Sequence, residues 1–377
     1  MRLQGFLFAI ASGCGFSTSV PPSPIIVDAV PDMLDAPVVP VCLQNRCRKK
    51  TITIDHGRVV GGPLLLFPLF VKITDPDFAN ALPTGVDFAF VSADNLTVPL
   101  AYERERFTNN ELLAWVAIPS LSSAADTKLY LYYGDPAAAD TQNRPGVWDA
   151  DFQAVWHLAE TIGGMAAIKD STARANHGTD LGGLTLDATG QLGAAARFDG
   201  VDDHLMIPQS PSITVTAARA TLGMWVNWTQ AVGTDYQRLL MSTNTLANDG
   251  RGMEWATNEF GQYYYYPSDA GGNNYASIAT PFMNGNWHQI TITQDFATKS
   301  VAIFFDGVQR TPMPDNTPTN WLNLTTASDW HWGGVPPRTA FTGMMDEIRV
   351  SKIVRSPGWI ATEYANQKSP STFYAVD

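Results

Sequence analysis

Short runs in which apolar and polar residues alternate recur along most of the chain, and they constrain its fold more than any other feature. In Thr221–Trp228 the apolar residues are Leu222, Met224, Val226 and Trp228, and Lys299–Phe305 repeats the pattern. Alternation with a period of two residues predicts strands that bury one face. Turn signals rich in Gly, Pro, Asn and Asp separate these runs, and Asp306-Gly307 predicts a hairpin.

The composition supports an extracellular protein built of β-sheets. Only 16% of the 377 residues are charged, 11% are aromatic, and the net charge is -12. Few charges together with many aromatic residues argue against long solvated helices, coiled coils and disorder. The acidic excess argues against a basic surface for nucleic acid, so no nucleic-acid partner is expected. A negative field instead favours cations such as calcium.

The N-terminus predicts export. Met1 and Arg2 precede a stretch of about nine apolar residues, which at 1.5 Å per residue cannot span ~30 Å of hydrocarbon. The stretch is typical of a secretory signal. Ala11-Ser12-Gly13-Cys14 resembles a bacterial lipobox, which implies that residues 1–14 are a lipoprotein signal peptide and that Cys14 carries the lipid. An ordinary signal peptide with an unrelated cysteine is the alternative.

The three cysteines fit this interpretation. An odd number is unusual for a secreted chain, and if Cys42 and Cys47 form a disulfide, Cys14 remains for acylation. A metal site at Cys42 and Cys47 is the alternative, but it lacks further ligands nearby. Residues 15–47 contain six prolines between positions 21 and 40 and predict a proline-rich tether. The protein is thus expected at the cell membrane or outer membrane, anchored by lipid without spanning it, and facing the periplasm or the cell surface.

Residues 48–150 predict a small β-sandwich, because short strands such as Thr51–Ile54 follow one another between turn signals. Phe67–Val71, Gly85–Phe90 and Leu129–Gly134 resemble the DUF2341 domain, a family typical of bacterial exported proteins that often precedes a laminin-G-like domain. The family brings no established activity. Glu103 and Glu105 share a strand face, but the alternating arginines favour a solvated sheet edge over an acid pair.

Residues 151–377 predict a larger antiparallel jelly roll of two packed sheets, so the whole folded part is expected to be all-β. Arg197–Leu205, Trp287–Ile290 and Gly343–Val350 resemble the concanavalin A-like, laminin-G-type jelly roll. The resemblance implies carbohydrate or glycoprotein binding in many relatives, catalysis in some, and often a structural calcium. Ser356–Gln367 predicts a short helix near the end of the chain.

Catalysis is not expected. Jelly-roll glucanases place acids at alternating positions on one strand, and the chain has no Glu-x-Asp-x-Glu series. It also lacks a Gly-x-Ser-x-Gly elbow and a His-Glu-x-x-His motif. A non-enzymatic protein is therefore predicted, with a glycan hydrolase or lyase as the alternative.

A structural calcium is expected in the jelly roll. Simple alternation puts Asp346 on a strand face with Met344 and Ile348, where an ionised carboxylate is costly unless it is paired or metal-bound. Asp170 and Asp346, with Asp203 as a third candidate, could supply oxygen ligands. The alternative is that each aspartate caps a turn.

A sugar site needs aromatic faces and planar polar groups on a rigid rim. The candidates are Tyr263, Tyr265, Asn273, Tyr275, Trp330 and Trp332. Core packing is the alternative for the tryptophans. The sequence therefore predicts a non-catalytic cell-surface lipoprotein that binds glycan or a cell-envelope polymer through its jelly roll. A structural or adhesive protein without a small ligand is the alternative.

Overall fold

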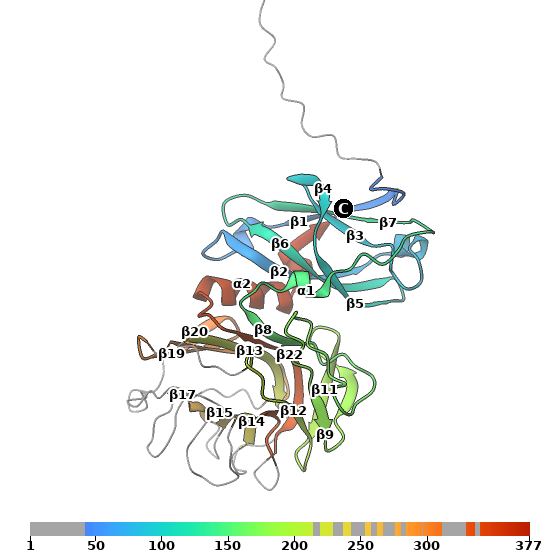
Figure 1. Cartoon of the computed structure of the whole chain (residues 1–377). Coiled ribbons are helices and arrows are strands. Elements are labelled where there is room, and N and C mark those ends of the chain that lie inside the picture. The colour runs from blue at the N-terminus through green and yellow to red at the C-terminus, as the bar shows by residue number, and fades with distance from the viewer. Residues whose placement is uncertain are drawn as a thin grey trace, which may run out of the picture. The chain divides into compact units, whose positions relative to one another are not determined.

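The computed structural model describes residues 42–213, 219–228, 237–242, 253–257, 262–266, 276–279, 284–295, 297–310, 329–335 and 340–377, and these belong to one compact unit. Antiparallel strands dominate this part of the chain and build two β-sandwiches (Figure 1). The all-β prediction is thus confirmed.

The first sandwich pairs a five-stranded sheet with a three-stranded sheet. The five-stranded sheet has the order β23 (Tyr374–Val376), β1 (Arg48–Ile54), β7 (Thr127–Tyr133), β3 (Ala89–Ser92) and β4 (Asn95–Pro99). The three-stranded sheet has the order β2 (Leu64–Thr74), β6 (Glu111–Leu121) and β5 (Tyr102–Thr108). Three short helices complete it: η1 (His56–Arg58), η2 (Pro76–Asn80) and α1 (Arg144–Val147).

The jelly roll also consists of two sheets. The eight-stranded sheet has the order β10 (Thr185–Thr189), β11 (Ala194–Asp199), β22 (Thr342–Ser351), β13 (Arg219–Trp228), β18 (Trp287–Asp295), β19 (Ser300–Phe305) and β20 (Val308–Arg310), with β8 (Phe152–Trp156) paired to β22. The seven-stranded sheet has the order β17 (Ala276–Ala279), β16 (Gln262–Tyr266), β15 (Met253–Thr257), β14 (Gln237–Ser242), β21 (Trp330–Trp332), β12 (His204–Ile207) and β9 (Thr179–Leu181).

Local sequence explains the turns that set the strand register. Asp306 and Gly307 both have positive φ, the conformation of the tight hairpin turn that matches strand twist, and they join β19 to β20. Asn109 and Asn110 do the same between β5 and β6. Asparagine and aspartate tolerate this conformation better than other non-glycine residues, which is why the turn signals were readable in the sequence.

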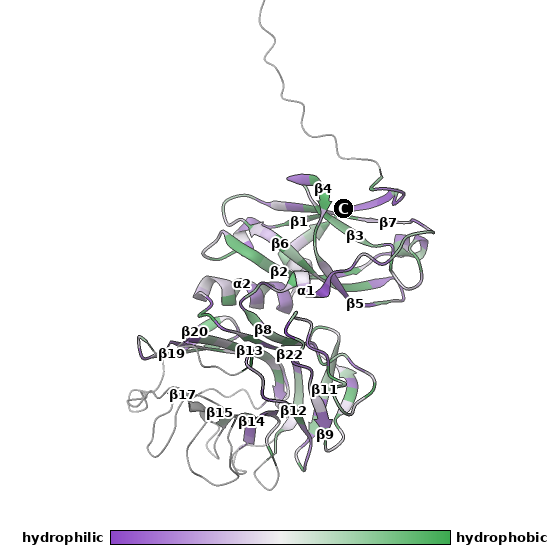
Figure 2. Ribbon diagram, viewed as in Figure 1, coloured by the Kyte–Doolittle hydropathy of each residue, from purple (hydrophilic) through white to green (hydrophobic). Residues whose placement is uncertain are grey.

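Alternation along the strands builds two separate apolar cores. Leu222, Met224, Val226 and Trp228 of β13 are buried between the jelly-roll sheets, as their spacing predicts. Trp225, on the opposite face of the same strand, belongs to the other core, together with residues of the first sandwich and the C-terminal helices. Figure 2 shows hydrophobic segments along strands of both sandwiches. Both faces of β13 are therefore buried.

The end of the chain returns to the first sandwich. The sequence assigns all of residues 151–377 to the jelly roll, so the predicted domain boundary differs from the structure here. After β22 the chain forms α2 (Pro357–Lys368) and α3 (Pro370–Phe373), and β23 then pairs with β1. The jelly roll is thus inserted between two strands of one sheet. The predicted helix over 356–367 is confirmed as α2, whose N-terminus is capped by the Ser356 hydroxyl accepting from the Trp359 amide.

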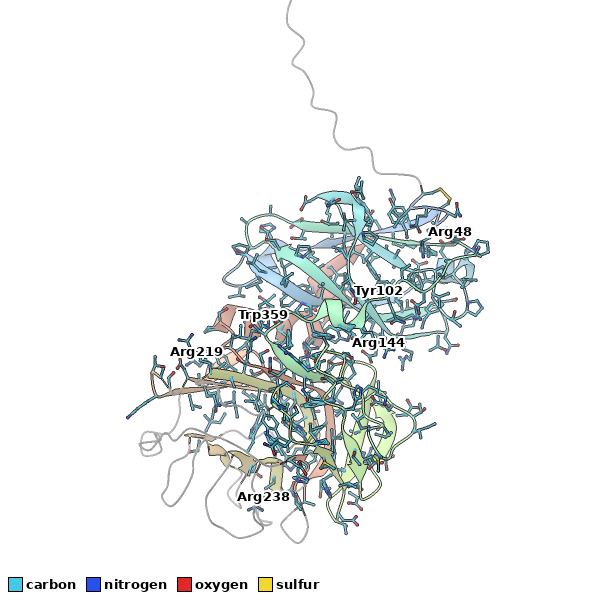
Figure 3. The ribbon with its side chains drawn as sticks, in the orientation of Figure 1. Arg48, Tyr102, Arg144, Arg219, Arg238 and Trp359 are labelled. Carbon is cyan, nitrogen blue, oxygen red and sulfur yellow. A yellow bond between two sulfur atoms is a disulfide. The ribbon has the colours of Figure 1, made fainter. Side chains whose placement is uncertain are left out.

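Helix α2 lies between the two sandwiches and bonds to both (Figure 1). The Asn366 side chain bonds to both the amide and the carbonyl of Phe70 in β2. On the other side, the Gln367 carbonyl accepts from the Trp225 indole, and Arg349 pairs with Glu363. Figure 3 shows Trp359 on the same helix, and its ring packs 5.1 Å from that of Phe67. The helix therefore links the two sandwiches.

Candidate functional site

The two tryptophans of the predicted aromatic rim belong to the core instead. Trp330 and Trp332 on β21 are 0% exposed and pack in the apolar interior of the jelly roll. Neither ring offers a face to a sugar, so their place in the rim has to be corrected. Asn273 and Tyr275 lie outside the described residues.

The tyrosine strand β16 lies near one end of the seven-stranded sheet. Its register places Tyr265 opposite Trp255 and Tyr263 opposite Thr257 on β15, and the side chains of Trp255 and Thr257 are buried. Directly paired positions share a face of the sheet. Positions 264 and 266 therefore lie on the other face of the strand.

One outer face of the jelly roll is covered. On the eight-stranded sheet, Trp225, Gln289 and Arg349 are buried and contact α2. The outer face of the seven-stranded sheet carries His204, Met206 and His331, all half-buried. Burial and the neighbouring His204 lower the pKa of His331 to about 4, so its imidazole is neutral at neutral pH. Among its described residues, the second sheet thus carries imidazole and thioether side chains on its outer face.

The predicted calcium ligands make the contacts of turn caps. The Asp170 carboxylate accepts from the amides of Val155, Thr172 and Asn176 and from the Thr172 hydroxyl. Asp203 accepts from the amide of Asp199. Within the described residues, Asp170, Asp203 and Asp346 do not form one group; Asp203 instead lies near Asp199 and Asp202. The turn-cap alternative fits Asp170 and Asp203.

Asp346 departs from the simple alternation because β22 contains a bulge. The register with β13 shifts between Gly223 and Trp225, and Glu347 has φ +55°, a left-handed conformation that costs a non-glycine residue ~1–2 kcal/mol. Met345 and Ile348 consequently both enter the core. Asp346 therefore does not share the Ile348 face, contrary to prediction. It accepts from the Leu192 amide, and burial followed by the charge of Glu347 raises its pKa well above the ordinary value.

The bulge contributes to a group of charges where the sandwiches meet, here called the junction cluster: the buried Glu103, His157, Glu347 and Arg349 and the half-buried Glu105. His157 follows β8, and its Nδ1 lies 2.7 Å from Glu347 Oε1 while its Nε2 lies 3.3 Å from Glu103 Oε2. Arg349 bonds Glu347 at 2.8 Å and Glu363 at 2.6 Å. Two carboxylates from different sandwiches thus flank one imidazole.

Aromatic rings and hydroxyls enclose the junction cluster. The Trp148 indole and the Ser171 hydroxyl donate to Glu103, and the Trp115 indole donates to Glu105. The Arg349 guanidinium lies 4.3 Å from the Trp115 ring centroid. Glu103 is 3% exposed, so the predicted solvated sheet edge is wrong at this position.

The charges of the junction cluster depend on one another. Burial alone would lower the pKa of His157, but the charges of Glu347 and Glu103 outweigh it and hold that pKa well above its ordinary value. Burial opposes ionisation of Glu103 as well, yet the His157 charge keeps the pKa of Glu103 below the ordinary value. Burial and the charge of Glu347 raise the pKa of Glu105 to about 8. The cluster therefore contains an imidazolium between two carboxylates and a protonated Glu105 at neutral pH.

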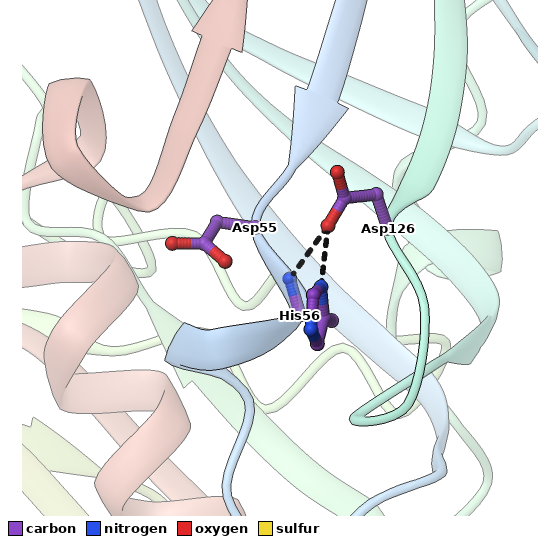
Figure 4. Close-up of side chains that lie close together, drawn as sticks. All are labelled: Asp55, His56 and Asp126. Atoms are coloured by element: carbon purple, nitrogen blue, oxygen red, sulfur yellow. Dashed lines mark hydrogen bonds and ion pairs between the residues drawn. The ribbon is translucent and has the colours of Figure 1, made fainter.

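A second histidine–carboxylate pair lies exposed at the surface and offers a comparison. His56 Nδ1 lies 2.7 Å from Asp126 Oδ1, and the His56 amide donates to the same oxygen (Figure 4). Asp55 points away and caps η1 through the Gly57 amide. Water screens this pair, so its contribution to stability is small.

The described chain begins at the predicted disulfide. Cys42 and Cys47 are bonded, as one of the two alternatives expected, and Cys14 lies outside the described residues. Within the described part of the chain, none of the helices has the length and apolarity needed to cross a membrane.

Replacing His157 tests the junction cluster. In His157→Gln, Glu103 and Glu347 lose the positive charge between them, and a broken buried ion pair typically costs ~3–5 kcal/mol in the free energy of unfolding. Urea denaturation at pH 7 measures this loss. His56→Gln, which breaks the exposed pair, is the matched control and should leave the unfolding midpoint almost unchanged. Equal effects of the two substitutions would contradict the assigned role of His157.

The raised pKa of Glu105 predicts a pH dependence. Between the ordinary value of 4.5 and about 8, the folded protein keeps a proton that the unfolded chain has released, so stability falls as pH rises. Glu105→Gln removes this proton and should flatten the decline of unfolding free energy between pH 5 and pH 8. Glu111→Gln, in an exposed ion pair of the same sheet, should leave the slope unchanged. Parallel curves for wild type and Glu105→Gln would refute the assignment.

Comparisons with known proteins agree with the two-sandwich architecture. The family model of DUF2341, a domain of unknown function, matches residues 84–156, and the Laminin_G_3 model, described as the concanavalin A-like lectin/glucanases superfamily, matches residues 199–361. No curated protein matches the chain.

Solved structures resemble parts of the chain at low sequence identity. The binding domain of Paraclostridial Mosquitocidal Protein 1 is 13% identical with a TM-score of 0.45, covering 57% of this chain and 52% of its own. The botulinum neurotoxin serotype D binding domain is 9% identical with a TM-score of 0.45, covering 58% and 52%. The chain thus spans about half the length of these toxin domains.

Domain 4 of AbnA, a GH43 extracellular arabinanase from Geobacillus stearothermophilus in complex with arabinotriose, is 18% identical with a TM-score of 0.40, covering 58% of this chain and 100% of its own. The two family matches stand in the order that the sequence predicts: residues 84–156 match the DUF2341 model, and residues 199–361 match the concanavalin A-like Laminin_G_3 model.

Proposed function

We propose that the protein is an exported bacterial surface lipoprotein that binds glycan or a cell-envelope polymer through its jelly roll, without catalysing a reaction on it. The observation that carries the proposal is the match of residues 199–361 to a superfamily described by its lectins and glucanases. Fold alone does not fix function, so the choice of surface has to come from this chain's own residues.

The seven-stranded sheet is the surface that fits a polymer. The outer face of the eight-stranded sheet packs against α2 and the junction cluster, through residues that include Trp225 and Arg349. Of the two jelly-roll sheets, as far as the structure describes them, the seven-stranded sheet is therefore the one whose outer face is not covered by α2. The strand β16 contains four consecutive tyrosines, and its register puts positions 264 and 266 on the face away from the core; tyrosine supplies both a ring face and a hydroxyl for sugar recognition.

The positions of the clustered acids support binding over hydrolysis. Glycosidases place two carboxyl groups on either side of a bond that the substrate brings to them. Glu103 and Glu347 do flank a common group, but that group is the buried His157 of the same chain. These two carboxylates hold the sandwiches together and leave no room for a glycosidic bond.

The N-terminal segment supports display at a membrane. Cys14 follows a short apolar stretch and small residues, and a proline-containing segment leads from it to the disulfide at Cys42 and Cys47. A lipid on Cys14 would hold the sandwiches near a membrane surface at the length of this tether.

The tyrosine strand gives a test of the binding surface. Tyr264→Ala and Tyr266→Ala, on the face opposite Trp255, should each weaken glycan or envelope-polymer binding by about fivefold or more, because each lost stacking face is worth ~1 kcal/mol or more. A glycan array with purified envelope polymers, followed by titration of the best ligand, measures the loss.

Tyr263→Ala and Tyr265→Ala are the matched controls, since their positions share the core-facing side of the strand. Absence of any polymer ligand for the wild type would favour the structural or adhesive alternative. Cleavage of a polysaccharide, abolished by replacing one carboxylate, would establish an enzyme.

The lipid anchor is tested separately in the native host. Cys14→Ser should move the protein from the detergent phase to the aqueous phase of a Triton X-114 extraction, because the acyl chains provide the membrane affinity. Metabolic labelling with a palmitate analogue should mark the wild type alone. Labelling that persists in Cys14→Ser would contradict the lipoprotein assignment.

A further inference from the structure

A row of nitrogen and sulfur donors crosses the outer face of the seven-stranded sheet. His331 on β21 is paired directly with Met206 on β12, and on its other side the register pairs it with position 241, a methionine, on β14. His204 lies two residues before Met206 and so on the same face. Trp330 and Trp332 point into the core, which fixes His331 on the outer side. The register therefore places two histidines and a methionine at neighbouring positions on one face of the sheet.

The two imidazoles have the arrangement of metal ligands. Their ring centroids lie 5.3 Å apart at an angle of 50°. Two imidazoles that bind one tetrahedral ion through bonds of ~2.0–2.1 Å have ring centres at a separation of this order. His204 Nδ1 lies 2.9 Å from the Asp202 carbonyl oxygen, so Nδ1 carries the proton and Nε2 keeps its lone pair.

His331 has a nitrogen that the rest of the described chain leaves unused. Its Nδ1 is buried from solvent and has no hydrogen-bond partner among the described residues. A buried nitrogen without a partner is costly, and a bound ion would remove that cost. The carbonyl bond of His204 is the kind of second contact that orients a metal-binding imidazole.

We propose that His204, His331 and Met206 form a binding site for a soft metal ion, Cu(I), on the outer face of the seven-stranded sheet. Thioether sulfur selects Cu(I) over hard cations, and imidazole is a good ligand for it. Calcium and magnesium prefer oxygen ligands, which none of these three side chains supplies. The metal site is independent of the proposed polymer binding, because metal binding requires the nitrogen and sulfur ligands and does not require the tyrosines of β16.

Competition for Cu(I) tests the site. The full chain with Cys14→Ser, which removes the competing thiol, is titrated anaerobically with Cu(I) against the chromophoric chelator bicinchoninate. The wild-type site should bind one equivalent. His204→Ala and His331→Ala should each weaken Cu(I) binding by about tenfold or more, the scale on which metal-site contacts act. Met206→Leu should weaken Cu(I) binding and leave Zn(II) binding unchanged, because zinc does not depend on the thioether.

Two matched controls come from elsewhere in the described chain. His56→Ala removes an exposed histidine of the first sandwich, and Met165→Leu removes a methionine that is 90% exposed. Neither should change Cu(I) affinity. Equal affinity of the wild type and the His204→Ala/His331→Ala double variant would overturn the proposal, and so would equal losses for Met165→Leu and Met206→Leu.

A measurement on the unaltered site keeps the proposal testable if a variant fails to fold. X-ray absorption at the copper edge of the Cu(I)-loaded Cys14→Ser protein should show both sulfur and imidazole nitrogen in the coordination shell. A shell without sulfur would refute the site. Glycan titrations of the same protein test the polymer proposal separately. A negative result for one proposal therefore does not decide the other.

Discussion

The imidazolium of His157 between Glu103 and Glu347 is the interaction on which the rest of the structure depends. Each of the three groups is almost fully buried, and none of them tolerates ionisation in an apolar setting alone. Because one carboxylate comes from β5 and the other from β22, His157 pairs with a carboxylate of each sandwich only while the sandwiches stay together. Replacing buried ion pairs by well-packed apolar residues often leaves the stability of a protein unchanged. The role of this group is therefore to fix how the two sandwiches pack against each other.

The path of the chain reinforces that arrangement. The chain leaves the first sandwich after β7, forms the jelly roll, and returns to the first sandwich through α2 and β23. Two connections therefore cross the junction. Asn366 and Gln367 are neighbours on α2, yet one bonds β2 and the other bonds β13. Because α2 makes polar contacts on both sides, its apolar residues are not gathered on one face. The helix also covers one sheet of the jelly roll, which removes that sheet as a binding surface.

The sequence predicts what depends on local rules. Strand alternation at Leu222–Trp228, the hairpin at Asp306-Gly307 and the helix over 356–367 all follow from neighbouring residues, and the structure confirms them. The sequence does not show whether Trp330 and Trp332 face the core or the solvent, because alternation identifies two faces of a strand without saying which one is buried. The bulge at Glu347 carries no local signal; only contact with His157, 190 positions away, makes its conformation useful. The return of β23 to β1 is equally non-local.

Differential scanning calorimetry of residues 42–377 tests most directly whether the buried charges make the two sandwiches one body. A single cooperative unit predicts one transition at pH 7, with equal calorimetric and van't Hoff enthalpies. Two resolved transitions, or a van't Hoff enthalpy well below the calorimetric one, would show that the jelly roll unfolds independently and would contradict the account.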